Sequence, residues 1–317
     1  MIRRHAISAL LALAPFAAFA DFPEKPLTFI VPFAAGSATY QLARALGQAV
    51  TAETKQTVIV DNKPGANAFI GAQSAAKAPK DGYSVFITTN TTHAANEHLF
   101  KKLPYDPVKD FEPVTLLSKG GQILIVTNSL PVKSVEDLVK LAKSKPGKLS
   151  FGYGSSSSRI AGELFKQMTG TYIVSIPYRS NPPAVTDLIG GQIEMMITDM
   201  ATGLPQVKGG KAKALGVSTL KRTALAPELP TISEAGVKGY EMSFWFAAYV
   251  PAGTPAPIVA KLNDLLVKAN KSASVQGFYA QNGFETLTST PDELRKFQAA
   301  ESQKWQKIIT SAGIEKE

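Results

Sequence analysis

The feature that most constrains the fold is a unit of short apolar strand, small-residue loop and amphipathic helix, which occurs twice. Apolar residues fill positions 27–33, and after the loop 34–39 they recur at helical spacing over 42–50. The second unit has a strand at 149–153 and a serine-rich loop at 154–159 before its helix. Small residues leave the N–H groups that open each helix accessible to an anion. Taken alone, either unit could also be an ordinary capped turn.

The rest of the chain alternates strand and helix patterns in the same way. Such alternation predicts parallel strands joined by helices that cover the faces of a sheet, so the fold class is α/β. Ligands of these sheets sit beyond the carboxyl ends of the strands. Further strands are expected at residues 57–60, 83–88, 114–117, 123–126, 172–177, 193–197, 212–217 and 244–249. Further helices are expected at 67–78, 94–100, 182–188, 257–271 and 291–311, with one more that opens at Ser134.

The length of the chain predicts two lobes. With 317 residues, 44% of them apolar, it can bury a sizeable core and exceeds the usual size of one domain. Gly120 and Gly121 separate two expected strands and mark a crossover, and the aromatic strand 244–249 is expected to cross back. Two βα units in separate lobes could then hold one anion from both sides. The predicted first lobe holds residues 21–120 and 246–317, and the second lobe holds residues 121–245.

The first twenty residues have the pattern of a secretory signal peptide. Arg3 and Arg4 precede an apolar run at 6–16, and the small-residue pattern of residues 18–20 predicts cleavage after Ala20. A retained membrane anchor is the alternative, but the apolar run is short for a bilayer span. We therefore expect export to the periplasm.

Composition excludes several kinds of site. Without cysteine the chain can form neither disulfides nor thiolate metal sites. The net charge of +9 comes from scattered lysines, without the clustered arginines and aromatics of a nucleic-acid surface, so attraction of small anions is the simpler use of this charge. No Gly-x-Ser-x-Gly elbow occurs, and His93, Glu97 and His98 do not have the zinc-protease spacing. We expect neither an enzyme nor a cofactor, metal or nucleic-acid partner.

A series of segments along the mature chain resembles one known family. In chain order they are VPFAAGSATYQLAR, DNKPGANAFIGA, PKDGYSVFITT, LPYDPVKDFEPVTLL, LAKSKPGKLSFGYGSSSSRIAGELF, IPYRSNPPAVTDLIGGQIEMMITD and FWFAAYVPAGTP. They resemble the Bug family, the periplasmic solute-binding proteins of tripartite tricarboxylate transporters. The resemblance implies a monomeric type II periplasmic binding fold, in which two lobes of mostly parallel sheet and flanking helices, joined by two crossover strands, close on a small carboxylate. It also implies delivery to an inner-membrane permease, or docking on a sensor domain instead.

The resemblance further implies which residues contact the ligand. From the first lobe these are Phe33, Gly36, Ser37, Ala38, Thr39, Tyr40, Thr89, Asn90, Thr91, Thr92 and His93. From the second lobe they are Ser155, Ser156, Ser157, Ser158 and Arg159, with Tyr178, Arg179 and Asp199 near the cleft.

Three positions depart from the family pattern and bear on the ligand. Tyr40 replaces an acidic residue, Arg159 a common histidine and Ser180 a glycine. The lost carboxylate at position 40 argues against amino acids, Tyr40 adds an aromatic face, and Arg159 offers a planar donor fork for a second carboxylate. We therefore expect an aromatic carboxylate, with a dicarboxylate such as terephthalate as the example. An aliphatic di- or tricarboxylate and a nicotinate-like acid stay open.

Structural explanations compete with these roles. Tyr40 could cap and pack, Arg159 could pair with Glu163 one helical turn away, and Asp199 could cap the segment that follows it. His93 could be a loop residue with its hydrogen bonds satisfied, and Phe33, Trp245 and Phe246 could be core or hinge residues.

Overall fold

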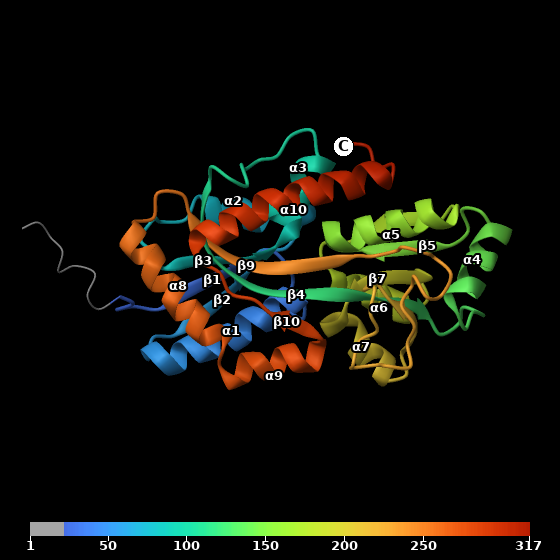
Figure 1. Cartoon of the computed structure of the whole chain (residues 1–317), viewed down its shortest axis with the longest axis horizontal. Helices are drawn as coiled ribbons and strands as arrows, with labels where there is room; N and C mark the ends of the chain where they lie inside the picture. Colours follow the sequence, from blue (N-terminus) through green and yellow to red (C-terminus); the bar gives the residue numbers. More distant parts are fainter. Residues whose placement is uncertain (1–21) are drawn as a thin grey trace, which may run out of the picture.

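The computed structural model describes residues 22–317, so the predicted signal peptide lies outside the described residues. Within them ten strands form one curled mixed sheet in the order β2-β1-β3-β9-β4-β7-β5-β6, and β8 and β10 pair with β4 (Figure 1). The strands are β1 (Leu27–Val31), β2 (Val58–Asn62), β3 (Ser84–Thr89), β4 (Phe111–Thr127), β5 (Ser150–Tyr153), β6 (Val174–Pro177), β7 (Met195–Asp199), β8 (Ala212–Val217), β9 (Ser243–Pro251) and β10 (Phe284–Thr286).

Helices cover the faces of this sheet. They are α1 (Ala38–Thr54), α2 (Phe69–Ala76), α3 (Asn96–Leu99), α4 (Val135–Ser144), α5 (Ser156–Thr169), α6 (Asn181–Ile189), α7 (Met200–Lys208), α8 (Ala256–Asn270), α9 (Ala273–Asn282) and α10 (Pro291–Ser311). A 3₁₀ turn, η2 (Ala66–Ala68), precedes α2, and a π-helical turn, η3 (Thr91–Ala95), precedes α3. In residues 22–317 no helix combines the length and the apolar character that a membrane span requires.

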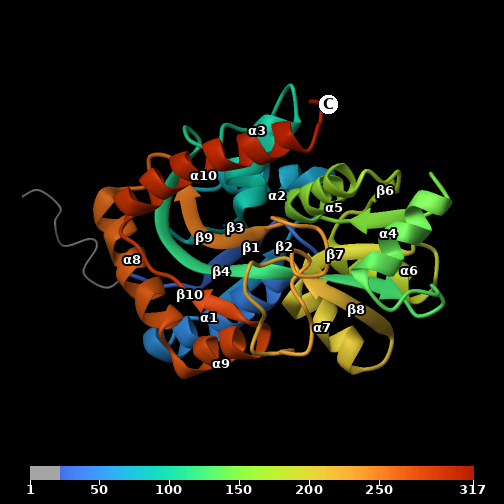
Figure 2. The ribbon, with the colours of Figure 1, turned by 45° about the vertical axis from the view of Figure 1, so that its right-hand side comes forward.

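The two lobes are joined through the long strand β4. From residue 111 to residue 121 it pairs with β9, and from residue 122 to residue 127 it pairs with β7 and β8 (Figure 2). Parallel pairs lie outside this seam, between β1 and its neighbours and between β5 and its neighbours. This change of partners lies one residue from the predicted boundary, and the pairing of β9 with β3 begins at Phe246. We propose the boundaries 120/121 and 245/246 on that basis.

The expected break at Gly120 and Gly121 is wrong, because β4 runs through both. A Cβ at Gly120 would lie 2.4 Å from the Phe284 ring, and one at Gly121 would lie 2.4 Å from Cγ2 of Thr219. Glycine is therefore required here for close packing across the strand rather than for ending it.

The predicted helical stripe of the first unit forms the core of the first lobe. Leu42, Leu46 and Val50 of α1 are fully buried against β1, β3, α8 and α9. Three elements were not predicted: α7, α9 and β10. The apolar residues of α9 do not recur as a helical stripe, and its burial depends instead on contacts with α1, α7, α8 and β10.

Candidate functional site

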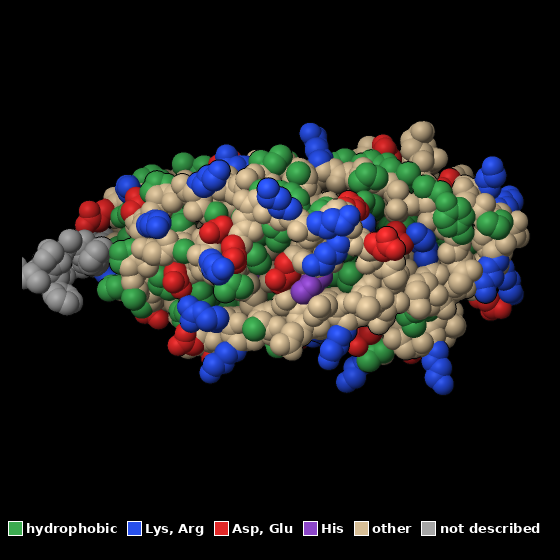
Figure 3. Space-filling view, turned by 90° about the horizontal axis from the view of Figure 1, so that it is seen from above, with side chains coloured by type: hydrophobic (Ala, Val, Ile, Leu, Met, Phe, Trp, Pro, Cys, Tyr) green, Lys and Arg blue, Asp and Glu red, His purple; other side chains and the backbone are tan. Residues whose placement is uncertain are grey.

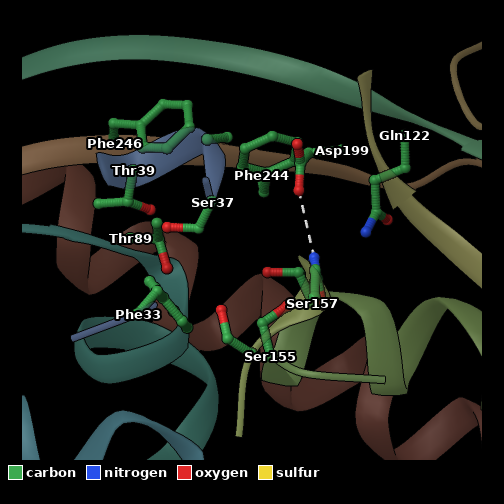
Figure 4. Close-up of a pocket in the computed structure, with 13 residues that line it drawn as sticks. Phe33, Ser37, Thr39, Thr89, Gln122, Ser155, Ser157, Asp199, Phe244 and Phe246 are labelled. Carbon is green, nitrogen blue, oxygen red and sulfur yellow. Dashed lines mark hydrogen bonds between the residues drawn. The ribbon is translucent and has the colours of Figure 1, made fainter. Parts of the chain in front are cut away.

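A cavity of about 370 Å³, counted with its opening to solvent, lies between the two lobes. It sits beyond the carboxyl ends of β1, β3, β5 and β7, as expected for parallel strands. Both crossover strands contribute to its wall. Its lining residues are Phe33, Ser37, Ala38, Thr39, Thr89, Gln122, Ser155, Ser157, Ser180, Asn181, Asp199, Phe244 and Phe246 (Figure 4).

The first lobe presents the start of α1 to the cavity. Ser37 caps the helix, and its Oγ accepts a hydrogen bond of 3.3 Å from the Tyr40 N–H. The N–H groups of Ala38 and Thr39 precede any possible intrahelical bond, so they are available to a ligand. Gly36 turns the chain into the helix with a φ of +83°, a conformation that favours glycine.

The second lobe presents the start of α5 in the same way. Ser155 and Ser158 form a capping box, in which Ser155 Oγ accepts from the Ser158 N–H at 3.2 Å and Ser158 Oγ accepts from the Ser155 N–H at 3.2 Å. The N–H groups of Ser156 and Ser157 remain free of intrahelical bonds. Gly154 is required before the cap, because a Cβ there would lie 1.9 Å from the carbonyl carbon of Ser180.

A polar end of the cavity is built by β4, β7 and the start of α6. Asp199 caps α7 by accepting a 2.8 Å hydrogen bond from the Thr202 N–H. Capping is the structural role that the sequence offered as the alternative for this residue. The Asn181 side chain donates to Asp199 at 3.2 Å and accepts from the Gly154 N–H at 3.0 Å. This chain of bonds ties the starts of α5, α6 and α7 together.

Three phenylalanine side chains also line the cavity. Phe33 follows β1, and Phe244 and Phe246 extend from alternate positions of β9 with ring centroids 5.2 Å apart in an edge-to-face arrangement. All three side chains are almost fully buried, and they line the cavity as well as the core. The cavity therefore joins an apolar wall to a polar one, the usual composition of a small-molecule site.

The positive character of the site comes from backbone groups. None of the lining residues is a lysine or arginine. Instead α1 and α5 point their N-termini at the cavity, each with a partial positive charge and free N–H donors. On the face seen in Figure 3, basic side chains are spread among acidic ones rather than gathered over one element. Anion binding here relies on helix starts.

Hydrogen bonds and an ion pair join the two lobes across the cleft, among them the following. The Ala34 N–H donates to Ser180 Oγ at 3.2 Å. The Asn90 side chain donates to Ser157 Oγ at 3.0 Å, and Ser156 Oγ donates to Asn96 at 2.6 Å. The structure therefore shows a closed arrangement, and part of the predicted serine run connects the lobes.

The structure brings together part of the predicted residue set. Eight of the predicted residues line the cavity: Phe33, Ser37, Ala38, Thr39, Thr89, Ser155, Ser157 and Asp199. The others lie outside its lining: Gly36, Tyr40, Asn90, Thr91, Thr92, His93, Ser156, Ser158, Arg159, Tyr178 and Arg179.

The two residues on which the ligand prediction depended are among those outside. Arg159 forms an ion pair with Glu317, and its side chain is 11% exposed. Glu163, the partner considered from sequence, pairs with Lys166 instead. Tyr40 packs against the apolar core of the first lobe. Neither residue is among those that line this cavity.

Other predicted residues have clear structural partners. Tyr178 donates a 2.7 Å hydrogen bond to Asp187, and Arg179 is exposed. Thr91, Thr92 and His93 are buried in η3. The His93 ring stacks on Tyr249 with centroids 3.8 Å apart.

Sequence reasoning missed five lining residues: Gln122, Ser180, Asn181, Phe244 and Phe246. A polar Gln122 between Gly121 and a run of apolar residues was a usable signal. Phe246 was assigned to the core or hinge, and Ser180 was noted only as a departure from the family pattern.

Comparison with known proteins agrees with this geometry. Residues 42–314 match the family model described as "Tripartite tricarboxylate transporter family receptor". The chain belongs to this family, the Bug receptors. Protein BugT of Bordetella pertussis is 32% identical over 92% of this chain and 90% of its own length. A protein of Pseudomonas sp. (strain P51), described as "UPF0065 protein in tcbD-tcbE intergenic region", is 34% identical over 91% of this chain and 86% of its own.

Three solved structures share the whole fold. "R. palustris Rpa4515 with adipate" superposes with a TM-score of 0.90 at 35% identity, covering 93% of this chain and 100% of that one. "Structure of periplasmic binding protein BugD" gives 0.89 at 32% identity with the same coverage. "MatC (Rpa3494) from Rhodopseudomonas palustris with bound malate" gives 0.86 at 28% identity, covering 91% of this chain and 100% of that one. The two-lobed binding-protein fold and the solute-binding role predicted from the sequence are confirmed.

Proposed function

We propose that this Bug receptor captures a small carboxylate with an apolar body in the cavity between its lobes. In this proposal it acts in the periplasm after cleavage behind Ala20 and delivers the ligand to a tripartite tricarboxylate-type permease. One observation carries the proposal: the starts of α1 and α5, from different lobes, meet at a cavity that Phe33, Phe244 and Phe246 also line.

The phenylalanine side chains of the cavity indicate what kind of ligand fits it. Three phenylalanine rings suit an aromatic ring or a short aliphatic chain and offer nothing to a strongly polar one. Terephthalate, the example expected from the sequence, belongs to this class through its ring. The similar protein titled with adipate favours an aliphatic member of the same class. The carboxylate would be held at the helix starts.

The free energies of the available contacts require both lobes to bind the ligand. A hydrogen bond to a charged group contributes about 1.5–3 kcal/mol. A helix N-terminus adds about 0.3–1 kcal/mol, more where it is partly buried. Micromolar affinity corresponds to about 8 kcal/mol. Neither helix start is sufficient alone, so the ligand must bridge them.

A thermal-shift screen of residues 21–317 tests the proposal. Benzoate, terephthalate, adipate, succinate, citrate and two amino acids serve as ligands, and at least one acid with an apolar body should raise the melting temperature while being recovered unchanged. Shifts from citrate or amino acids alone would contradict the proposed class. Consumption of the ligand would contradict a receptor.

A matched pair of variants locates the site. Thr39→Val removes a hydroxyl that lines the cavity, whereas Thr51→Val makes the same change further along α1, away from the cavity. The ligand's effect should shrink in the first variant and persist in the second. Equal effects would place binding elsewhere.

A further inference from the structure

One end of the cavity carries two side chains that offer hydrogen-bond acceptors. Gln122 of β4 and Asp199 of β7 are direct partners in the antiparallel register, so their side chains lie on the same face of the sheet. Figure 4 shows both among the residues that line the cavity. The two residues are 2% and 7% exposed, so bulk water has little access to their polar atoms.

Gln122 has an acceptor without a partner. Its Oε1 is buried and makes no hydrogen bond with any described residue. Buried polar atoms are nearly always satisfied by protein, water or ligand. Gln122 lines the cavity, so the cavity is the side from which a ligand can reach this amide group.

Asp199 brings a carboxylate to the same place without a cationic partner. In residues 22–317 its hydrogen bonds come from the Thr202 N–H, Asn181 and Thr198, and no ion pair joins it to a lysine, arginine or histidine. The bonds from Asn181 and Thr198, at 3.2 and 3.4 Å, are long. A carboxylate has about four acceptor sites and three are used here, so one stays open on a side chain that lines the cavity.

We propose that Gln122 and Asp199 form a subsite for a hydrogen-bond donor on the ligand, a hydroxyl or an amino group. This inference rests on the proposed function and narrows its ligand class to carboxylates that carry such a donor on the apolar body. The carboxylate binds at the starts of α1 and α5, and the donor binds beside Gln122 and Asp199. An ionised second carboxylate in this subsite would face the charge of Asp199, with no lysine or arginine in the cavity lining to offset the repulsion.

Paired ligands test the subsite directly. Calorimetric titration of residues 21–317 compares 4-hydroxybenzoate with benzoate, and malate with succinate, because each pair differs in one hydroxyl. In at least one pair the hydroxylated acid should bind about tenfold more tightly or better. Terephthalate should bind less tightly than 4-hydroxybenzoate.

Two substitutions then show whether the preference comes from these residues. Gln122→Leu removes the unpartnered acceptor without breaking a side-chain hydrogen bond among the described residues, and Asp199→Asn removes the charge while keeping a residue that can cap α7. Both should reduce the ratio of affinities within each ligand pair toward one. Thr51→Val should keep the preference, and a circular dichroism melt checks the fold of each variant.

Three results would overturn the inference. Equal affinities within both ligand pairs in the unmodified protein would remove the subsite, and so would a preference that survives in Gln122→Leu and Asp199→Asn. In both cases the proposed carboxylate-binding function would stand. If no carboxylate bound at all, the proposed function would fail together with the inference.

Discussion

His93 provides a sharp test of how the core of the first lobe responds to acid. The side chain is fully buried, stacked on Tyr249 and bonded through Nδ1 to Thr92 Oγ1 at 2.8 Å, while its Nε2 has no partner. Burial lowers the pKa of His93 from 6.5 to about 3. The ring is therefore neutral in the folded protein at every pH above that value.

The sign of the pH dependence follows from this shift. Between pH 6.5 and pH 3 the unfolded chain binds a proton at His93 that the folded protein does not, so stability is full above pH 6.5 and falls as the pH is lowered. For one such group the loss between pH 7 and pH 5 is about 2 kcal/mol.

His93→Phe keeps an aromatic ring in the stack and removes the titrating group. Urea unfolding followed by the fluorescence of the buried Trp245 and Trp305 gives the free energy of unfolding at each pH. Other titrating groups cancel in the difference between variant and unmodified protein. As the pH falls from 7 to 5, the free energy of unfolding of His93→Phe should rise by about 2 kcal/mol relative to that of the unmodified protein.

A second histidine gives the control. Burial also lowers the pKa of His98. This side chain is only partly buried, however, and the neighbouring Glu97 carboxylate opposes the lowering of its pKa. His98→Gln should therefore change the pH dependence much less. Parallel pH curves for His93→Phe and the unmodified protein would refute the assignment of acid sensitivity to His93.

Two further substitutions test the positions of residues around the site. Arg159→Ala should weaken a monocarboxylate and the matching dicarboxylate by the same factor in calorimetric titration, because Arg159 pairs with Glu317 and lies outside the cavity lining; a selective loss of the dicarboxylate would return Arg159 to the site. Gly154→Ala should destabilise the protein by about 3 kcal/mol or more in urea unfolding, because its Cβ would overlap the Ser180 carbonyl carbon; an unchanged unfolding midpoint would contradict that close approach.

Local chemistry made part of this site predictable from sequence. The strand–loop–helix units at α1 and α5 can be recognised from the spacing of their apolar residues and from the serines at their cap positions. Ser37 and Ser155 were therefore placed at helix starts that line the cavity. Because ligands of parallel sheets bind beyond the carboxyl ends of the strands, each loop was also expected on the ligand side of its own lobe.

Long-range pairing made the rest unpredictable. The register that sets Gln122 opposite Asp199 depends on how β4 pairs with β7, and nothing local fixes it. The same holds for Arg159, whose partner Glu317 lies at the far end of the chain rather than one helical turn away. Phe246 shows a different limit, because an aromatic residue in a buried strand can face core and ligand at once.

Closure and binding must be linked in this receptor, because each lobe supplies only one set of ligand donors. Ser156→Ala separates the two contributions: it removes the bond between Ser156 and Asn96 across the cleft, keeps the backbone N–H, and leaves the cavity lining unchanged. A hydrogen bond of this kind contributes about 0.5–1.5 kcal/mol to the closed form. Since every ligand draws on the same closed population, all affinities should fall by one common factor, roughly threefold to tenfold. Titration with benzoate, adipate and succinate measures that factor, and a loss confined to one ligand would show that Ser156 contacts the ligand itself.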